Sequence, residues 1–154
     1  MNHKLTDQEI VELRDYVTIN DMMNNINHDL TQYHKQRDHL DEHFLDDATM
    51  VVNGFEMKGR EAIRKAYSTR KNENVGPGMT LNMLVGNPRI KVQGDSTTVD
   101  LVWTGILNEN LETPPRLLQQ GTDHTELVKV DGEWKIKYRV ITSLSNMPDA
   151  WNGS

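Results

Sequence analysis

The sequence predicts an α+β domain in which N-terminal helices pack into a strongly curved antiparallel sheet. Two observations predict this: apolar residues recur at helical spacing over residues 6–67, and β-rich segments separated by turn signals follow from residue 79 onward. At 154 residues the chain fits one domain. We divide it into an N-terminal helical extension (1–18), the domain proper (19–143) and a C-terminal tail (144–154).

The composition argues against several classes of function. With 23 acidic against 17 basic residues the formal net charge is -6, and no basic cluster could bind phosphates, so we expect no nucleic-acid partner. Apolar runs are only a few residues long and the N-terminus turns acidic at once, so we expect neither a membrane span nor a secretory leader. Cysteine is absent, which excludes disulfides and thiolate metal sites. We therefore expect a cytoplasmic protein.

The helical half begins with a capping box, Thr6-Asp7-Gln8-Glu9, in which the side chains of Thr6 and Glu9 satisfy each other's backbone amides. Behind it we predict one apolar stripe on a long or broken helix, formed by Ile10, Leu13, Val17, Ile19, Met23, Ile26, Leu30 and Tyr33. A short second helix follows, with Leu40 and Phe44 as its buried pair, and a third covers residues 59–67.

The sheet begins with a strand at 48–52, which the turn signal Asn53-Gly54 ends. Further strands are predicted at 80–92, 98–107, 122–130 and 134–142. Asn87-Pro88 indicates a bulge within the first of these, and the segment 111–116 is predicted to be a loop. Asp131-Gly132 is the strongest hairpin signal in the chain.

Two parts of the chain resemble a known family. Leu40-Asp41-Glu42-His43-Phe44-Leu45-Asp46-Asp47-Ala48, followed by Gly59-Arg60-Glu61-Ala62-Ile63, is similar to the L-x-x-x-F-x-x-D-A … G-R-E-A-I signature of SnoaL-like members of the NTF2-like superfamily. The strand from Gly121 to Val130-Asp131-Gly132-Glu133-Trp134 resembles the G-x-Y-x-D-x-L-x-R-x-D-G-x-W-x-I hairpin of that family. The resemblance covers residues 19–143. It implies a cone around one deep, mostly apolar pocket, and a homodimer formed through the outer sheet face.

The resemblance also implies a choice between two kinds of function. The family includes scytalone dehydratase, a dehydrochlorinase, ketosteroid isomerase and polyketide cyclases, but also non-catalytic binding domains. One expectation is a cofactor-independent lyase or isomerase that moves protons on a hydrophobic cyclic or polyketide-like molecule. The alternative is a non-catalytic small-molecule-binding or dimeric scaffold of the same fold, because fold does not determine function.

The Asp–His dyad of the dehydratase and dehydrochlorinase branch is missing from this chain. Counting back from Ala48 places Tyr33 at the position of the Asp, and the His position falls at Asn82. A phenol and an amide can orient a substrate carbonyl or hydroxyl, but neither is a useful base at neutral pH. Alternatively, Tyr33 is a core aromatic residue and Asn82 an ordinary strand residue.

Asp123 is the remaining carboxylate candidate. Strand alternation places Gly121, Asp123, Thr125 and Leu127 on one face, which the resemblance points toward the pocket. An apolar pocket raises the pKa of an aspartate and lets it shuttle a proton. Arg139 on the last strand is either a charge partner for it or an exposed strand arginine. Replacing Asp123 by Asn is then expected to lower turnover and to leave the melting temperature unchanged or higher. Alternatively Asp123 bonds Tyr33, Tyr138 or a backbone group, or faces the other way.

Histidine is concentrated between His28 and His43. His39-Leu40-Asp41-Glu42-His43 matches the H-x-x-E-H zinc pattern, but Leu40 and Phe44 occupy the buried side, so we expect His39 and His43 to point to solvent and expect no metal or cofactor. His28 lies five residues before Tyr33, where relatives often carry a pocket aromatic; alternatively it is a surface residue. The catalytic candidates are Asp123, Tyr33 and His28, and the substrate-binding candidates are Asn82, Thr125, Trp103, Tyr138, Arg139 and Val52.

Overall fold

The computed structural model describes residues 4–31, 37–69 and 80–144. Its elements are α1 (Asp7–Thr31), the 3-10 helix η1 (Arg37–His43), β1 (Phe44–Val52), β2 (Phe55–Lys58), α2 (Arg60–Thr69), β3 (Thr80–Gln93), β4 (Ser96–Asn108), β5 (Arg116–Val130) and β6 (Glu133–Ser143). No helix within these ranges is long and apolar enough to cross a membrane.

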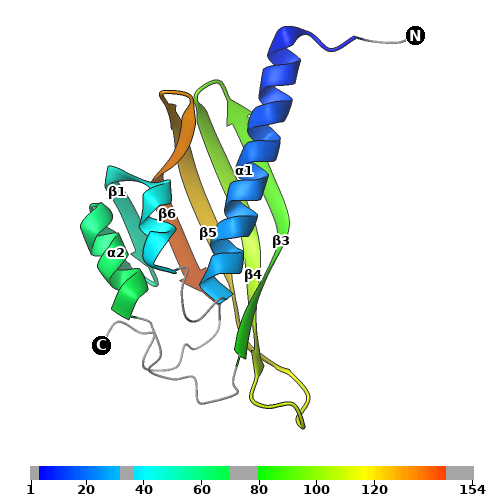
Figure 1. The fold of residues 1–154 in the computed structure, drawn as a ribbon, viewed down its shortest axis with the longest axis vertical. Coiled ribbons are helices and arrows are strands. Elements are labelled where there is room, and N and C mark those ends of the chain that lie inside the picture. The colour runs from blue at the N-terminus through cyan, green and yellow to red at the C-terminus, as the bar shows by residue number, and fades with distance from the viewer. Residues whose placement is uncertain (1–3, 32–36, 70–79, 145–154) are drawn as a thin grey trace.

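The six strands form one curved sheet in the order β2-β1-β6-β5-β4-β3, and the helices lie on one side of it (Figure 1). Neighbouring strands are antiparallel except β1 and β6, which run parallel, so the sheet is mixed. This exception arises because β1 and β6 are far apart in the chain and are not joined by a hairpin. The predicted α+β cone is confirmed, with the helices packed into the curl of the sheet.

Two tight turns have the backbone geometry that their residues favour. Asn53 and Gly54 have φ values of 50° and 86°, and Asp131 and Gly132 have 52° and 82°. Positive φ at both central residues is the mark of the type I′ hairpin, whose twist matches that of the flanking strands. Both turn predictions are confirmed, and the second turn joins β5 to β6.

The bulge predicted at Asn87-Pro88 is also confirmed. The pairing of β3 with β4 shifts register between Gly86 and Arg89, and Asn87 has a φ of 51°.

Two strands begin earlier in the chain than the sequence predicted. Phe44 begins β1 rather than ending a helix, although it is buried as expected, and β5 starts at Arg116, six residues earlier than predicted.

The capping box is confirmed: the Glu9 amide donates to Thr6 Oγ1 at 3.2 Å, and the Thr6 amide donates to Glu9 Oε2 at 2.7 Å. The prediction of one apolar stripe along the helix is wrong. Ile19, Met23 and Ile26 are at most 3% exposed and pack into the sheet, with Leu30 against them, whereas Ile10, Leu13 and Val17 are 43–55% exposed. The helix is continuous, but its first turns do not share the buried face.

Candidate functional site

A buried ion pair joins the two central strands of the sheet. Asp123 on β5 and Arg139 on β6 are offset by two residues in register, because Thr125 is the residue opposite Arg139. Arg139 Nε and Nη2 donate to Asp123 Oδ2 at 3.0 and 2.5 Å. The two residues are 3% and 1% exposed, so this pair lies entirely within the core.

Three further side chains complete the cluster. Thr125 Oγ1 donates to Asp123 Oδ1 at 2.7 Å, and Arg139 Nη1 lies 3.4 Å from the Tyr67 hydroxyl, to which it donates. That hydroxyl in turn donates to Met50 Sδ at 3.2 Å. Strands β5, β6 and β1 and helix α2 therefore converge on one polar centre surrounded by the apolar core.

The alternation predicted for β5 is confirmed. Gly121, Asp123, Thr125 and Leu127 are all buried, whereas the intervening residues are half-buried or exposed. Gly121 allows Trp103 of the neighbouring strand to lie directly over the backbone: a Cβ added there would collide with the Trp103 ring. Trp103 Nε1 donates to the Thr122 carbonyl at 3.2 Å, which holds the ring in place.

Electrostatics keeps Arg139 charged despite its burial. Burial alone lowers the pKa of Arg139, but attraction to Asp123 outweighs it and raises that pKa further above its ordinary value. Asp123 accepts two hydrogen bonds from Arg139 and one from Thr125, so both of its oxygens are engaged. The cluster therefore offers a fixed cation beside a hydroxyl, rather than an unengaged carboxylate.

The catalytic candidate His28 and the binding candidate Asn82 do not join this pair. His28 is 67% exposed at its side chain, next to Asp29, and Tyr33 lies outside the described residues. Asn82 is exposed on β3. The structure thus gives Asp123 its buried partners but does not bring His28 or Asn82 to them.

Among the proposed binding residues, Thr125, Trp103, Arg139 and Val52 are buried. Tyr138 is half-buried and, as the residue paired with Glu126, lies on the opposite face of the sheet from Arg139. Tyr138 and Arg139 face opposite sides because they are neighbours in one strand. The register shift between Glu126 and Leu127 makes Arg139 the residue that faces inward.

Gln119 is a polar core residue that the sequence analysis missed. It is 3% exposed on β5, and its Oε1 has no hydrogen-bond partner in the part of the chain that the structure describes. It lies in the same inward row as Gly121 and Asp123, so extending the alternation two steps toward the N-terminus would have found it. Buried polar atoms are usually hydrogen-bonded, so this oxygen is an exception among the described core residues.

His43 corrects a second expectation. It was expected to point to solvent, but it is half-buried at the end of η1. Burial, and after it the positive charge of Lys135, lowers the pKa of His43. His39 is exposed, and its Nδ1 lies 3.2 Å from Glu42 Oε1. Across the described ranges, no three His, Asp or Glu side chains gather into a metal-binding group.

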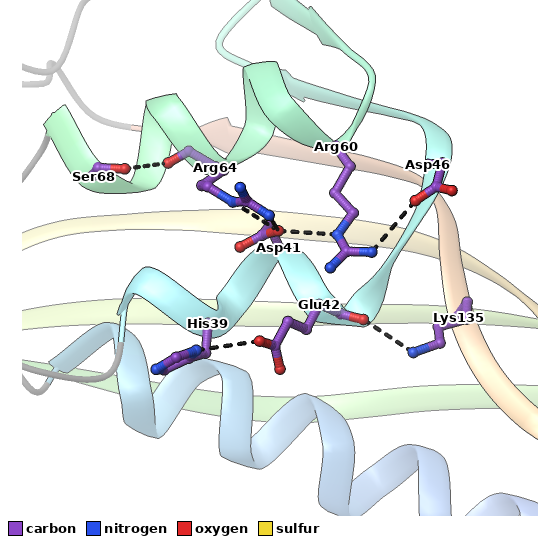
Figure 2. Close-up of polar contacts among 8 residues, drawn as sticks. All are labelled: His39, Asp41, Glu42, Asp46, Arg60, Arg64, Ser68 and Lys135. Carbon is purple, nitrogen blue, oxygen red and sulfur yellow. Dashed lines mark hydrogen bonds and ion pairs between the residues drawn. The ribbon is translucent and has the colours of Figure 1, made fainter.

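The signature residues near α2 form a separate structural network. Figure 2 shows Arg60 and Arg64 of α2 reaching toward Asp41 of η1, which is 1% exposed. Arg60 Nε and Arg64 Nη2 each lie 3.0 Å from Asp41 Oδ2, and Arg60 also contacts Asp46 at 3.3 Å. Burial alone raises the pKa of Asp41, but hydrogen bonds from the two arginines outweigh it and lower that pKa. These ion pairs link α2 to η1.

A groove of about 400 Å³ lies on the outer face of the sheet. His124 and Asp100 stand beside each other in it, with His124 Nδ1 2.6 Å from Asp100 Oδ1, and Glu126 Oε1 lies 3.6 Å from His124 Nε2. The hydrogen bond to Asp100 raises the pKa of His124. Arg89 and Val140 also line the groove.

The mixed curved sheet with helices packed inside it is the fold of NTF2-like proteins. The family model for the SnoaL-like domain matches residues 12–140, so the chain belongs to the SnoaL-like family. The solved structures that resemble this chain include a putative scytalone dehydratase, a protein named for its action on a small molecule.

Solved structures agree with this assignment. An NTF2-like protein with a cystatin-like fold from Novosphingobium aromaticivorans superimposes with a TM-score of 0.76 at 17% identity, covering 98% of this chain and 96% of that one. A putative scytalone dehydratase from the same organism gives 0.67 at 27% identity, with 92% and 89% covered. ActVI-ORFA from Streptomyces coelicolor gives 0.71 at 14% identity, with 84% and 96% covered. No curated protein matches the sequence.

Proposed function

We propose that this protein binds a hydrophobic cyclic or polyketide-like molecule at the inner face of its sheet and catalyses a cofactor-independent proton transfer on it. The reaction class is that of a lyase or isomerase: dehydration, cyclisation or double-bond isomerisation. The observation that carries the proposal is a permanently charged Arg139 held within an apolar core next to the Tyr67 hydroxyl. The likeness to a putative scytalone dehydratase at 27% identity supports the dehydratase variant.

The chemistry follows from the donors of Arg139. A guanidinium has five N–H groups, and the contacts described above use three of them. In a low-dielectric interior, a fixed cation stabilises the negative charge that develops on a substrate carbonyl oxygen when an adjacent C–H proton moves to Asp123 Oδ1, the carboxylate oxygen that Arg139 does not contact. In this proposal Thr125 positions Asp123, and Asp123 also holds the guanidinium. The Tyr67 hydroxyl, which donates to Met50 Sδ in this structure, turns to donate to the substrate oxygen.

A specific observation favours the alternative, a non-catalytic binding domain. Both oxygens of Asp123 are engaged by Thr125 and Arg139, so the carboxylate that the sequence suggested as a base is occupied by its own neighbours. The same interior could hold a ligand through Arg139 and Gln119 without performing any reaction.

Scytalone is a suitable first probe because of the putative dehydratase neighbour. We expect the purified protein to convert scytalone to its dehydrated product, measured by mass spectrometry. Tyr67→Phe, which retains the ring, should lower turnover by roughly 10-fold to 100-fold. Tyr16→Phe is the matched control, because Tyr16 is a 41% exposed tyrosine outside the core, and it should leave turnover unchanged.

The outcomes separate the two functions. Calorimetric binding of scytalone without product formation would favour the binding domain over the enzyme. Turnover that Tyr67→Phe leaves intact would remove this cluster from the mechanism, and absence of both binding and turnover would reject this substrate class.

We further propose that the outer sheet face forms a homodimer and that the protein works in the cytoplasm. None of the described helices lies on the outer face (Figure 1), and half-buried Val102 and Val140 lie in its groove. Val140→Asp should then lower the mass measured by sedimentation, whereas an unchanged mass would reject this interface. Cell fractionation tests the location.

A further inference from the structure

Gln119 is a buried amide on the inner face of β5, in the same row as Asp123. It is 3% exposed, and its Oε1 accepts no hydrogen bond from the residues that the structure describes. A buried carbonyl without a donor destabilises a fold, whereas an apolar side chain of similar size does not. Natural folds depart from such rules mainly at functional sites, so this amide indicates a role in binding.

A bulge in β5 turns Gln119 inward. Gly105 of β4 pairs with Gln119. The next residue of β4, Ile106, pairs with Leu117, which leaves Leu118 as the extra residue of the bulge. In a regular strand Leu117 and Gln119 would share a face, but Leu117 is 63% exposed and Gln119 is buried. The backbone therefore departs from regular pairing at the point where the amide enters the core.

An aromatic ring lies between Gln119 and the buried ion pair. Gln119 and Asp123 are four residues apart on one strand, which separates their backbones by about 13 Å. Gly121 lies midway, and the Trp103 ring lies against it in the place that a side chain would fill. A flat apolar molecule lying along the Trp103 ring would therefore point one end at Arg139 and the other at Gln119.

A second unsatisfied atom lies in the opposite direction from the ion pair. Thr97 Oγ1 on β4 also lacks a partner in the described ranges, at 2% exposure. Thr97 pairs with the buried Leu127, so a large apolar side chain occupies the inner face there. The face beside Gln119 carries Gly105 and Gly121 instead, which have no side chains. A ligand held at the ion pair therefore extends toward Gln119 rather than toward Thr97.

We propose that Gln119 determines ligand specificity by accepting a hydrogen bond from a hydroxyl at the end of the ligand that is remote from Arg139. The assignment rests on the proposed function, in which Arg139 and the Tyr67 hydroxyl hold a carbonyl oxygen at the near end. A hydrogen bond at each end takes up about 3 Å, which leaves on the order of 7 Å between the two oxygens of the ligand. This length fits two fused rings, so the ligand class is a bicyclic hydroxy-ketone with its carbonyl and hydroxyl at opposite ends.

Two ketones that differ by one hydroxyl test the assignment. The probe 1-tetralone carries only the carbonyl, and 6-hydroxy-1-tetralone adds a hydroxyl at the opposite end of the two rings. Calorimetric titration of the full chain should show that the wild type binds the hydroxylated ketone roughly 3-fold to 10-fold more tightly, the range expected for one hydrogen bond. Gln119→Met keeps the length of the side chain and removes the acceptor, so this variant should bind both ketones equally.

The matched control is Gln120→Met. Gln120 is the next residue of β5 and is exposed on the outer face, so this variant should keep the wild-type preference. The melting temperature without ligand is a second readout. Gln119→Met should leave it unchanged or raise it, because the variant removes an unsatisfied carbonyl from the core. A lower melting temperature would show that the amide is a structural hydrogen-bond partner and would overturn the assignment.

The titrations distinguish this assignment from the proposed function. If the wild type binds both ketones equally, or if the preference survives Gln119→Met, the role of Gln119 is overturned and binding at the inner face still holds. If neither ketone binds, the result counts against the proposed function itself, and the assignment falls with it.

Discussion

Arg139 and Asp123 form an ion pair across two neighbouring strands, with Nε and Nη2 of the arginine both directed at Oδ2 of the aspartate. The other oxygen of Asp123 receives the Thr125 hydroxyl, so the pair is fully enclosed by protein. A buried charge of this kind is tolerated only while its partner remains. This relationship changes what a substitution of Asp123 is expected to do.

Asp123→Asn should destabilise the fold strongly. The change leaves the Arg139 charge buried without its anion, and breaking such a pair costs about 3–5 kcal/mol. The free energy of unfolding from urea titration should fall by this amount, with Asp21→Asn, an exposed site on α1, as the control. The sequence alone suggested an unchanged or higher melting temperature. If that is what is measured, the ion pair does not contribute to stability in solution.

Asp15→Asn tests the attachment of α1 to the β5–β6 hairpin. Burial alone raises the pKa of Asp15, but hydrogen bonds from Lys129 and Trp134 outweigh it and lower that pKa below 3.8. The carboxylate therefore stabilises the fold above pH 3.8, and this contribution is lost as pH falls through the lowered value. At pH 7 the free energy of unfolding of the variant should be about 1–3 kcal/mol lower than that of the wild type. A stability difference that does not shrink at all as the pH falls below 3.8 would contradict this electrostatic origin.

Gly121→Ala should destabilise the core through the Trp103 ring. The added methyl group would meet both this ring and the Thr142 carbonyl oxygen. Overpacking of this kind costs about 1–3 kcal/mol. Gly86→Ala on β3, where a Cβ meets nothing within 4 Å, is the matched control, and both variants can be compared by thermal denaturation. Equal melting temperatures would mean that Trp103 moves aside without cost.

His124 and His43 should titrate on opposite sides of 6.5, the ordinary value for histidine. Hydrogen bonding to Asp100, with Glu126 nearby, raises the pKa of His124, and burial lowers that of His43. The contribution of His124 to stability is thus complete below pH 6.5 and lost as pH rises through its raised pKa. The contribution of His43 is complete above pH 6.5 and lost as pH falls. The pH dependence of the imidazole NMR shifts, assigned with His124→Gln and His43→Gln, measures both pKa values. A pKa of His43 above that of His124 would contradict the geometry.

Much of the fold was readable from local signals in the sequence. The capping box at Thr6 and Glu9, the turn at Asp131-Gly132 and the bulge at Asn87-Pro88 depend on residues adjacent in the chain, so their physics is local. Alternation along β5 likewise placed Asp123 on one face with Thr125 and Leu127, because side chains of a strand alternate regardless of what surrounds it, and the family resemblance pointed that face inward.

Tertiary structure decided the rest. Ile10 and Ile19 are both isoleucines in the same helix, so local sequence does not tell them apart. Ile19 faces the sheet and Ile10 does not, because the bonds of Asp15 to Lys129 and Trp134 set the rotation of the helix. Arg139 and Tyr138 are neighbours in sequence, and the register shift near Glu126 selects Arg139 for the interior. The ion pair itself joins residues on separate strands, and the energy of a buried charge depends on partners that come together only when the chain folds. The sequence by itself thus determined most of the elements and which residues of β5 share a face, because these depend on neighbours in the chain, whereas folding decided which charges meet in the core.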